Sequence, residues 1–165
     1  MSARDEARAD FLAAAGWAAA ERRRLAGDAS FRRYERLDKT GETAVLMDAP
    51  PDLEDVRPFV RIARVLTDWR FSAPKILAVD EAMGFVLLED LGDDLFTRAL
   101  GGSGGDEREL YEAAVDTLVA IQGHAPPGGL PRFDERRILD EVALFLDWTL
   151  PALTGISVRR AAVVA

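Results

Sequence analysis

The sequence has 165 residues, which is enough for one ordinary domain or two small lobes. It is 48% hydrophobic with a formal net charge of -8, which excludes global disorder and argues against broad binding to nucleic acid phosphates. It contains no cysteine, so disulfides, thiolate metal sites and cysteine nucleophiles are excluded. No apolar run approaches the roughly 18 residues that span a bilayer, and the N-terminus is a poor signal peptide. We therefore expect a cytoplasmic protein without nucleic acid or membrane partners.

The first half of the chain predicts a helix followed by strands. Residues 3–16 are rich in alanine and end at Gly16, a typical C-terminal stop of a helix. Short strands are expected at 22–27 and 31–37, joined by a turn of small residues. The continuous apolar run at 43–47 is typical of a strand buried on both faces.

A second helix and two more strands are expected next. Residues 52–69 repeat apolar side chains with the helical period, with Asp52 as a candidate cap and Pro58 in the first turn. Strands are expected at 75–79 and 84–89. The remaining chain predicts helices at 93–100, 106–123 and 134–150, the last ending before Pro151, with a Gly-Ser linker at 101–105. Because strands precede most helices, the order predicts an α+β fold.

Four blocks of the sequence resemble the aminoglycoside phosphotransferase family, which has a protein-kinase-like fold. They are LAGDASFRRYERL, AVLMDAPPDLEDVRPFVRIARVL, SAPKILAVDEAMGFVLLEDLGDDLF and LFLDWTLPALTG. Within the family they are most similar to the branch that phosphorylates N-acetylated amino sugars in cell-wall recycling.

The resemblance implies a particular domain organisation. An N-terminal helix would occupy residues 1–20. A kinase-like small lobe, with about five antiparallel strands and a helix, would occupy residues 21–91. The hinge and the start of an incomplete helical lobe would occupy residues 92–165.

The resemblance also implies a nucleotide site for ATP with Mg²⁺. The turn after the first strand would lie over the phosphates, where small residues let backbone N–H groups approach and arginine offers a planar fork of donors. The segment VLLEDLG would be the hinge that meets adenine. The expected nucleotide-binding residues are Gly27, Asp28, Ala29, Ser30, Phe31, Arg32, Arg33, Met47, Glu89, Asp90 and Leu91.

Plainer interpretations of the same residues stay open. The turn and its arginines are also typical of a solvated β-hairpin. The hinge segment is equally a strand end followed by an acidic loop, and Met47 is equally an ordinary core methionine.

The sequence departs from the family at its catalytic positions. Met47 stands where the third strand of a kinase carries lysine, and the helix after it lacks the partner glutamate. No H-x-D motif occurs, and His124, the only histidine, is expected to be solvated in a loop. We therefore expect no catalytic or metal-ligating residues, and the residues that bind the acceptor sugar stay unknown.

Three functions remain open at this point. The first is the nucleotide-binding portion of an ATP-dependent sugar phosphotransferase whose amino-sugar substrate binds only in a full-length relative. The second is a non-catalytic, pseudokinase-like binding module, and the third is an acidic α+β domain without a ligand. A homodimer through exposed apolar surface is a further expectation.

Overall fold

The computed structural model describes residues 2–26, 30–101 and 106–156. The chain divides into two compact units, Met1–Ala113 and Ala114–Ala165. The division falls within helix α4 (Glu107–Gln122).

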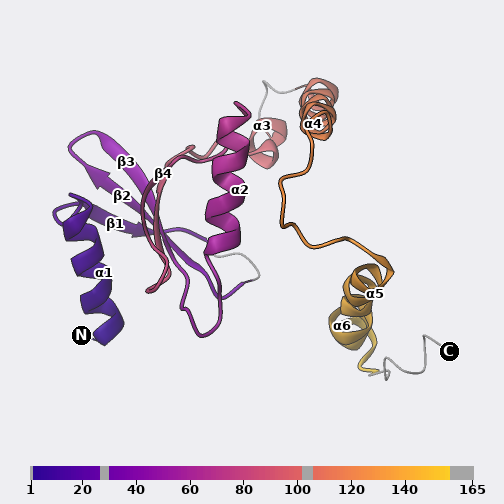
Figure 1. Ribbon diagram of the computed structural model, residues 1–165, viewed down its shortest axis with the longest axis horizontal. Helices are drawn as coiled ribbons and strands as arrows, with labels where there is room; N and C mark the ends of the chain where they lie inside the picture. The colour runs from indigo at the N-terminus through magenta and orange to yellow at the C-terminus, as the bar shows by residue number, and fades with distance from the viewer. Residues whose placement is uncertain (1, 27–29, 102–105, 157–165) are drawn as a thin grey trace. The chain divides into compact units, whose positions relative to one another are not determined.

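A five-stranded antiparallel sheet forms the first unit (Figure 1). Its strands lie in the order β1-β2-β3-β5-β4. Their bounds are β1 Glu21–Arg24, β2 Arg33–Lys39, β3 Glu42–Asp48, β4 Ile76–Asp80 and β5 Phe85–Glu89. The run at 43–47 is therefore part of a strand paired on both sides, as its unbroken apolar character predicts. The expected α+β fold with an antiparallel five-stranded sheet is confirmed.

Helix α1 (Ala3–Ala14) covers one face of this sheet. Ser2 and Asp5 close its N-terminus as a capping box, which satisfies backbone donors that the first turn leaves without partners. The helix packs Leu12 against Leu37, Leu46 and other side chains of alternate strand positions. The whole buried set on this face is Leu12, Trp17, Leu37, Ala44, Leu46, Phe85 and Leu87.

Helix α2 (Arg57–Asp68) covers the opposite face. The intervening strand positions point to it, because successive side chains of a strand alternate between faces. The buried set on this face is Met47, Ala49, Val56, Val60, Val86 and Leu88. Two helices and the sheet between them thus make a three-layered unit with two small cores.

The start of α2 differs from the expectation that Asp52 caps it. The cap position is Val56, without a side-chain hydrogen bond, and Pro58 lies in the first turn. The amides of Leu53 and Glu54 both donate to the carbonyl of Pro50, so the chain completes a turn before the helix begins. Asp52 could cap the helix only if the residues directly after it were helical, but the helix begins at Arg57.

The last helical segment also differs from its expected end at Pro151. Helix α5 (Glu135–Leu144) runs into a π-helical turn η1 (Phe145–Thr149) and then into α6 (Leu150–Thr154). Because the π-helical register changes the bonding pattern there, Pro151 falls in the first turn of α6, where its missing N–H is tolerated. The segment ends instead at Gly155, whose φ is 70°.

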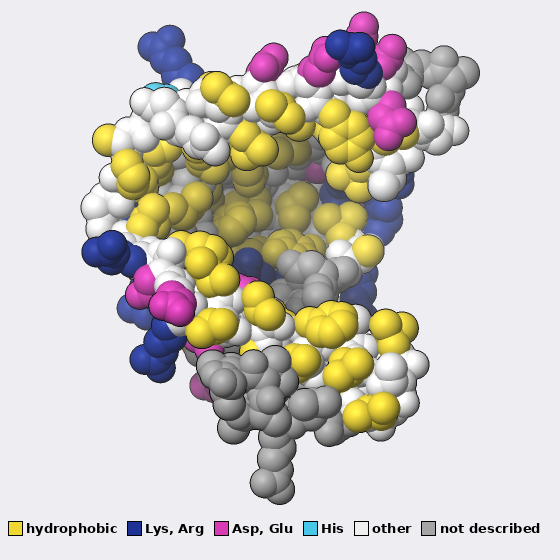
Figure 2. Space-filling view, turned by 90° about the vertical axis from the view of Figure 1, so that its right-hand side faces the viewer, with side chains coloured by type: hydrophobic (Ala, Val, Ile, Leu, Met, Phe, Trp, Pro, Cys, Tyr) yellow, Lys and Arg dark blue, Asp and Glu magenta, His cyan; other side chains and the backbone are white. Residues whose placement is uncertain are grey.

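The second unit exposes much of its apolar surface. Within its described residues only Ala143 is buried, while Val142, Trp148 and Leu153 are exposed. Hydrophobic side chains are visible at the molecular surface in Figure 2. The expectation that a second copy of the chain covers such surface stays a prediction. Helix α3 (Phe96–Gly101) belongs to the first unit. Among the described residues of the whole chain, no helix is long and apolar enough to cross a membrane.

Candidate functional site

The candidate site is a cavity of about 510 Å³ where β1 and β5 leave the sheet. Its apolar wall is made by Val45 of β3 and Leu88 of β5, with Leu25 and Leu95 from the flanking segments. The full lining is Arg23, Arg24, Leu25, Ala26, Arg36, Val45, Pro74, Leu88, Glu89, Asp90, Leu91, Gly92, Asp93, Leu95 and Arg98. Ligand pockets typically combine such apolar walls with a few polar groups.

The segment that follows β5 forms the polar rim of this cavity. Gly92 adopts a φ of 80°, and its N–H donates to Asp90 Oδ1 at 3.0 Å, which turns the chain sharply. Among the described residues, nothing bonds to the backbone N–H or carbonyl of Leu91, which is 57% exposed. These two groups are free to pair with one edge of a planar heterocycle.

Arg36 of β2 holds this segment against the sheet. Its guanidinium donates to Asp90 Oδ1 at 3.0 Å and to Asp93 Oδ2 at 2.7 Å. The side chains of Arg36 and Asp90 are only 13% and 6% exposed. One arginine thus neutralises two carboxylates and sets the path of the chain beside the cavity.

The same contact perturbs ionisation at the rim. The hydrogen bond from Arg36 holds the pKa of Asp93 below its usual value, with the positive charges of Arg36 and Arg98 acting in the same direction. Asp93 is therefore ionised whenever the arginine contact is formed at neutral pH.

The structure brings three of the expected nucleotide-binding residues to the cavity, namely Glu89, Asp90 and Leu91. Glu89 uses its side chain elsewhere, since its carboxylate accepts from the backbone N–H of Lys75 at 3.2 Å. Only the main chain of this segment is therefore available to a ligand at that position.

The turn before β2 is only partly described. Gly27, Asp28 and Ala29 lie outside the described residues. Ser30 Oγ accepts from the N–H of Arg32 at 3.1 Å, and Glu54 accepts from both the N–H of Phe31 and the Nε of Arg32. This contact with Glu54 ties the end of the turn to the loop after β3.

Two other expected residues lie away from the cavity. Met47 is fully buried between the sheet and α2, so the residue of β3 that lines the cavity is Val45, two positions earlier. Arg33 lines a different cavity, on the α1 side of the sheet. Because the side chain of Met47 has no exposed surface, it cannot contact a ligand unless the core opens. This favours the interpretation of Met47 as an ordinary core methionine.

The alternation of side chains between the two faces of β2 explains why Arg33 and Arg36 reach different cavities. Arg33 and Arg36 are three positions apart in β2, an odd number, so their side chains point to opposite faces of the sheet. Arg36, which was not among the expected site residues, therefore lies at the rim while Arg33 does not.

The described residues offer little to a metal ion. Among residues 2–26, 30–101 and 106–156, no group of three or more His, Asp or Glu side chains could hold one. The two carboxylates at the rim are already bound by Arg36. These residues therefore do not fit a magnesium site.

Comparison with known proteins identifies the family of the chain. Residues 21–162 match the phosphotransferase enzyme family, a region that begins at β1. The N-acetylmuramate/N-acetylglucosamine kinase of Pseudomonas aeruginosa is 40% identical over 153 residues, covering 91% of this chain and 45% of that protein. The proteins of the same name from Caulobacter vibrioides and Pseudomonas putida are each 37% identical, covering 98% and 79% of this chain and 54% and 38% of theirs. The chain spans about half the length of the curated relatives that it matches.

Proposed function

The chain belongs to the phosphotransferase enzyme family, and from this premise we propose that it is the nucleotide-binding portion of an amino-sugar kinase that uses ATP. The cavity beside residues 89–91 takes the adenine. The relatives' names support an N-acetylated amino sugar as the acceptor in the whole enzyme. We propose a cytoplasmic location on the same basis.

The single observation that carries the proposal is the unpaired backbone of Leu91 at the rim of an apolar cavity. Adenine has two flat apolar faces and an edge with one hydrogen-bond donor and several acceptors. Val45 and Leu88 suit its faces, and the N–H and carbonyl of Leu91 suit its edge. In this arrangement Asp90 and Glu89 position the main chain and make no side-chain contact with the base.

The phosphates would extend toward the turn at residues 27–33. Gly27, Asp28, Ala29, Ser30 and the amide of Phe31 would approach them through backbone groups, and Arg32 would add positive charge. The amide of Phe31 and the side chain of Arg32 would first have to leave Glu54, to which they donate at 3.1 Å and 3.2 Å. We therefore expect these residues to add little to affinity in the chain by itself.

The test is a calorimetric titration of the 165-residue chain with adenosine and with ATP. We expect dissociation constants of about 1 mM or weaker, because a cavity open on one side forgoes a few kcal/mol of apolar burial. The variant Val45→Phe fills the cavity and should abolish binding of both ligands. The matched control is Val119→Phe on α4, where the side chain is 63% exposed and outside the cavity.

The outcomes separate the parts of the proposal. Unchanged adenosine binding by Val45→Phe, with an unchanged melting temperature, would exclude this cavity as the adenine site. If ATP binds more tightly than adenosine and Gly27→Val removes the difference, the turn holds phosphate. Micromolar binding would contradict the expected weakness and indicate a more complete cleft.

A non-catalytic binding module is the second candidate. These 165 residues contain one histidine, His124, with no aspartate two positions after it, so they hold no H-x-D motif that could supply catalysis by themselves. If the purified chain binds adenosine but never transfers phosphate to N-acetylmuramate, this second candidate gains support over an enzyme that is complete in these residues.

A further inference from the structure

A second cavity lies on the α1 side of the sheet. It has a volume of about 320 Å³ and is lined by Arg8, Arg24, Arg33, Tyr34, Glu35 and Asp48. Arg33 and Glu35 share the face of Leu37, which belongs to the core under α1, whereas Arg36 points to the other face. This cavity is therefore separate from the candidate adenine site, although Arg24, on the edge strand β1, borders both.

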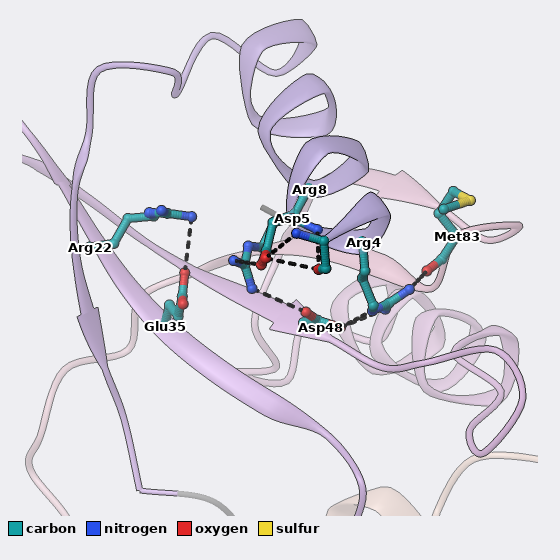
Figure 3. A network of polar contacts seen from close by, with 8 residues as sticks. Arg4, Asp5, Arg8, Arg22, Glu35, Asp48 and Met83 are labelled. Carbon is teal, nitrogen blue, oxygen red and sulfur yellow. Dashed lines mark hydrogen bonds and ion pairs between the residues drawn. The ribbon is translucent and has the colours of Figure 1, made fainter.

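The carboxylates at this cavity already have partners (Figure 3). Asp48, 3% exposed, accepts from Arg4 Nε at 2.8 Å and from Arg8 at 3.4 Å. Arg8 also donates to Asp5 at 2.6 Å. These contacts tie the first turns of α1 to the end of β3.

Glu35 forms a longer ion pair with Arg22 of β1, with 3.7 Å between the charged atoms and no hydrogen bond to Glu35 Oε2 from the described residues. Asp5, Glu35 and Asp48 thus face three arginines that bind them, which are Arg4, Arg8 and Arg22. The negative charge of the cavity is balanced without using its remaining cations.

Two arginines at the cavity have no such partner. No ion pair joins Arg24 or Arg33 to any of the described residues, and both side chains are exposed. Arginine keeps its charge at any pH that the fold survives. The cavity and its ion-pair partners together therefore hold five arginines and three carboxylates, an excess of two positive charges in a chain whose net charge is -8.

The strand register brings these two side chains together. Arg24 lies opposite Glu35 and Arg33 lies opposite Asp48. Arg24 and Arg33 are thus diagonal neighbours on adjacent strands, a relation that places two residues about 7–8 Å apart. Two long guanidinium side chains at that spacing can converge on a single dianion.

We propose that this cavity binds the dianion of a phosphate group, with Arg24 and Arg33 as its donors. Two planar forks of N–H donors match the oxygens of phosphate better than those of a carboxylate, which has one oxygen fewer. The volume lies at the small end of ligand pockets, which suits free phosphate or the phosphate of a small monoester. Arg8 closes the cavity from α1, a helix that precedes the region matching the phosphotransferase family.

The experiment titrates the 165-residue chain with inorganic phosphate, glucose 6-phosphate and acetate at constant ionic strength, followed by NMR of backbone amides. The shifts that saturate should centre on Arg33, Glu35 and Asp48. Arg33→Gln and Arg24→Gln should each weaken phosphate binding about tenfold, since each removes charged donors. The matched control Arg136→Gln, at an exposed position of α5, changes the net charge equally and should leave binding unchanged.

Each outcome decides the proposal. Glucose 6-phosphate binding more tightly than inorganic phosphate identifies a monoester as the ligand, and equal binding identifies free phosphate; both support the site. An absence of saturable shifts at 20 mM phosphate overturns it, as do equal binding of acetate and equal weakening by Arg136→Gln. Displacement of phosphate by adenosine would also overturn it, because adenosine has no phosphate and occupies the other face. Arg24→Gln keeps the test decisive if Arg33→Gln fails to fold, since Arg24 is exposed on an edge strand.

Discussion

Replacing Arg36 with methionine is the sharpest test of how the rim of the adenine cavity is held. Methionine keeps the length of the side chain but removes its charge and its donors. Asp90, whose side chain is 6% exposed, then loses its cation, and Asp93 loses a 2.7 Å contact. The segment from Glu89 to Gly92 should become less ordered.

The expected loss of stability follows from the burial of this pair. An exposed pair contributes about 0.5 kcal/mol, whereas breaking a fully buried pair costs about 3–5 kcal/mol. Because Arg36 and Asp90 are buried but border an open cavity, we expect a loss of roughly 2 kcal/mol. For a unit of this size that lowers the melting temperature by about 10 °C.

The assay is urea unfolding of wild type, Arg36→Met, Asp90→Asn and the double variant, with adenosine titration of each. Asparagine removes the charge that Arg36→Met leaves buried, so the double variant should recover at least half of the lost stability. Adenosine binding should weaken in Arg36→Met because the backbone of Leu91 is no longer held in place. Additive effects in the double variant, or a loss below about 0.5 kcal/mol, would refute the argument that Arg36 compensates buried charge.

Three further predictions concern the fold, its pH dependence and activity. Gly84→Ala should destabilise the chain by about 2 kcal/mol more than Gly41→Ala in urea unfolding. Both glycines have a positive φ, but only at Gly84 would an added Cβ fall 1.9 Å from the carbonyl oxygen of Ala49. Equal losses of stability would contradict this clash. Because folding lowers the pKa of Asp93, its ionised form stabilises the fold above the ordinary aspartate pKa near 3.8, and this stabilisation is lost as the pH falls through the lower pKa of the folded state. Arg36→Met should therefore flatten the dependence of the unfolding free energy on pH between about pH 4 and 2. An unchanged profile would exclude this linkage. The purified chain should not transfer phosphate from ATP to N-acetylmuramate, because the family's H-x-D motif is missing from it; turnover that is lost on mutation within the chain would show that this is wrong.

Much of the first unit could be predicted from the sequence because its signals are local. The alanine-rich segment ending at Gly16, the apolar run at 43–47 and the helical period after Pro58 each depend on neighbouring residues only. They correspond to α1, β3 and α2. The resemblance to the phosphotransferase family supplied what local patterns lack, namely that the strands form one antiparallel sheet.

The same local signals were wrong at the ends of two helices. Asp52 has the chemistry of a cap, but the turn closed by Pro50 occupies its position, and a π-helical turn carries the last helix past Pro151. Both are local hydrogen-bond patterns that the preferences of single residues for helix starts and stops do not specify.

The amino-acid sequence by itself determined the order of the helices and strands, the resemblance to the family, and the end of the fifth strand just before residues 90 and 91. Only the tertiary structure decided what each arginine near the turn does. Arg32 meets Glu54, Arg33 faces the cavity under α1, and Arg36 binds the carboxylates of the rim. The physical reason is that an ion pair depends on which side chains are close in space. The carboxylates that bind Arg32 and Arg36 lie 22 to 57 positions away in the sequence, and the fold brings them together.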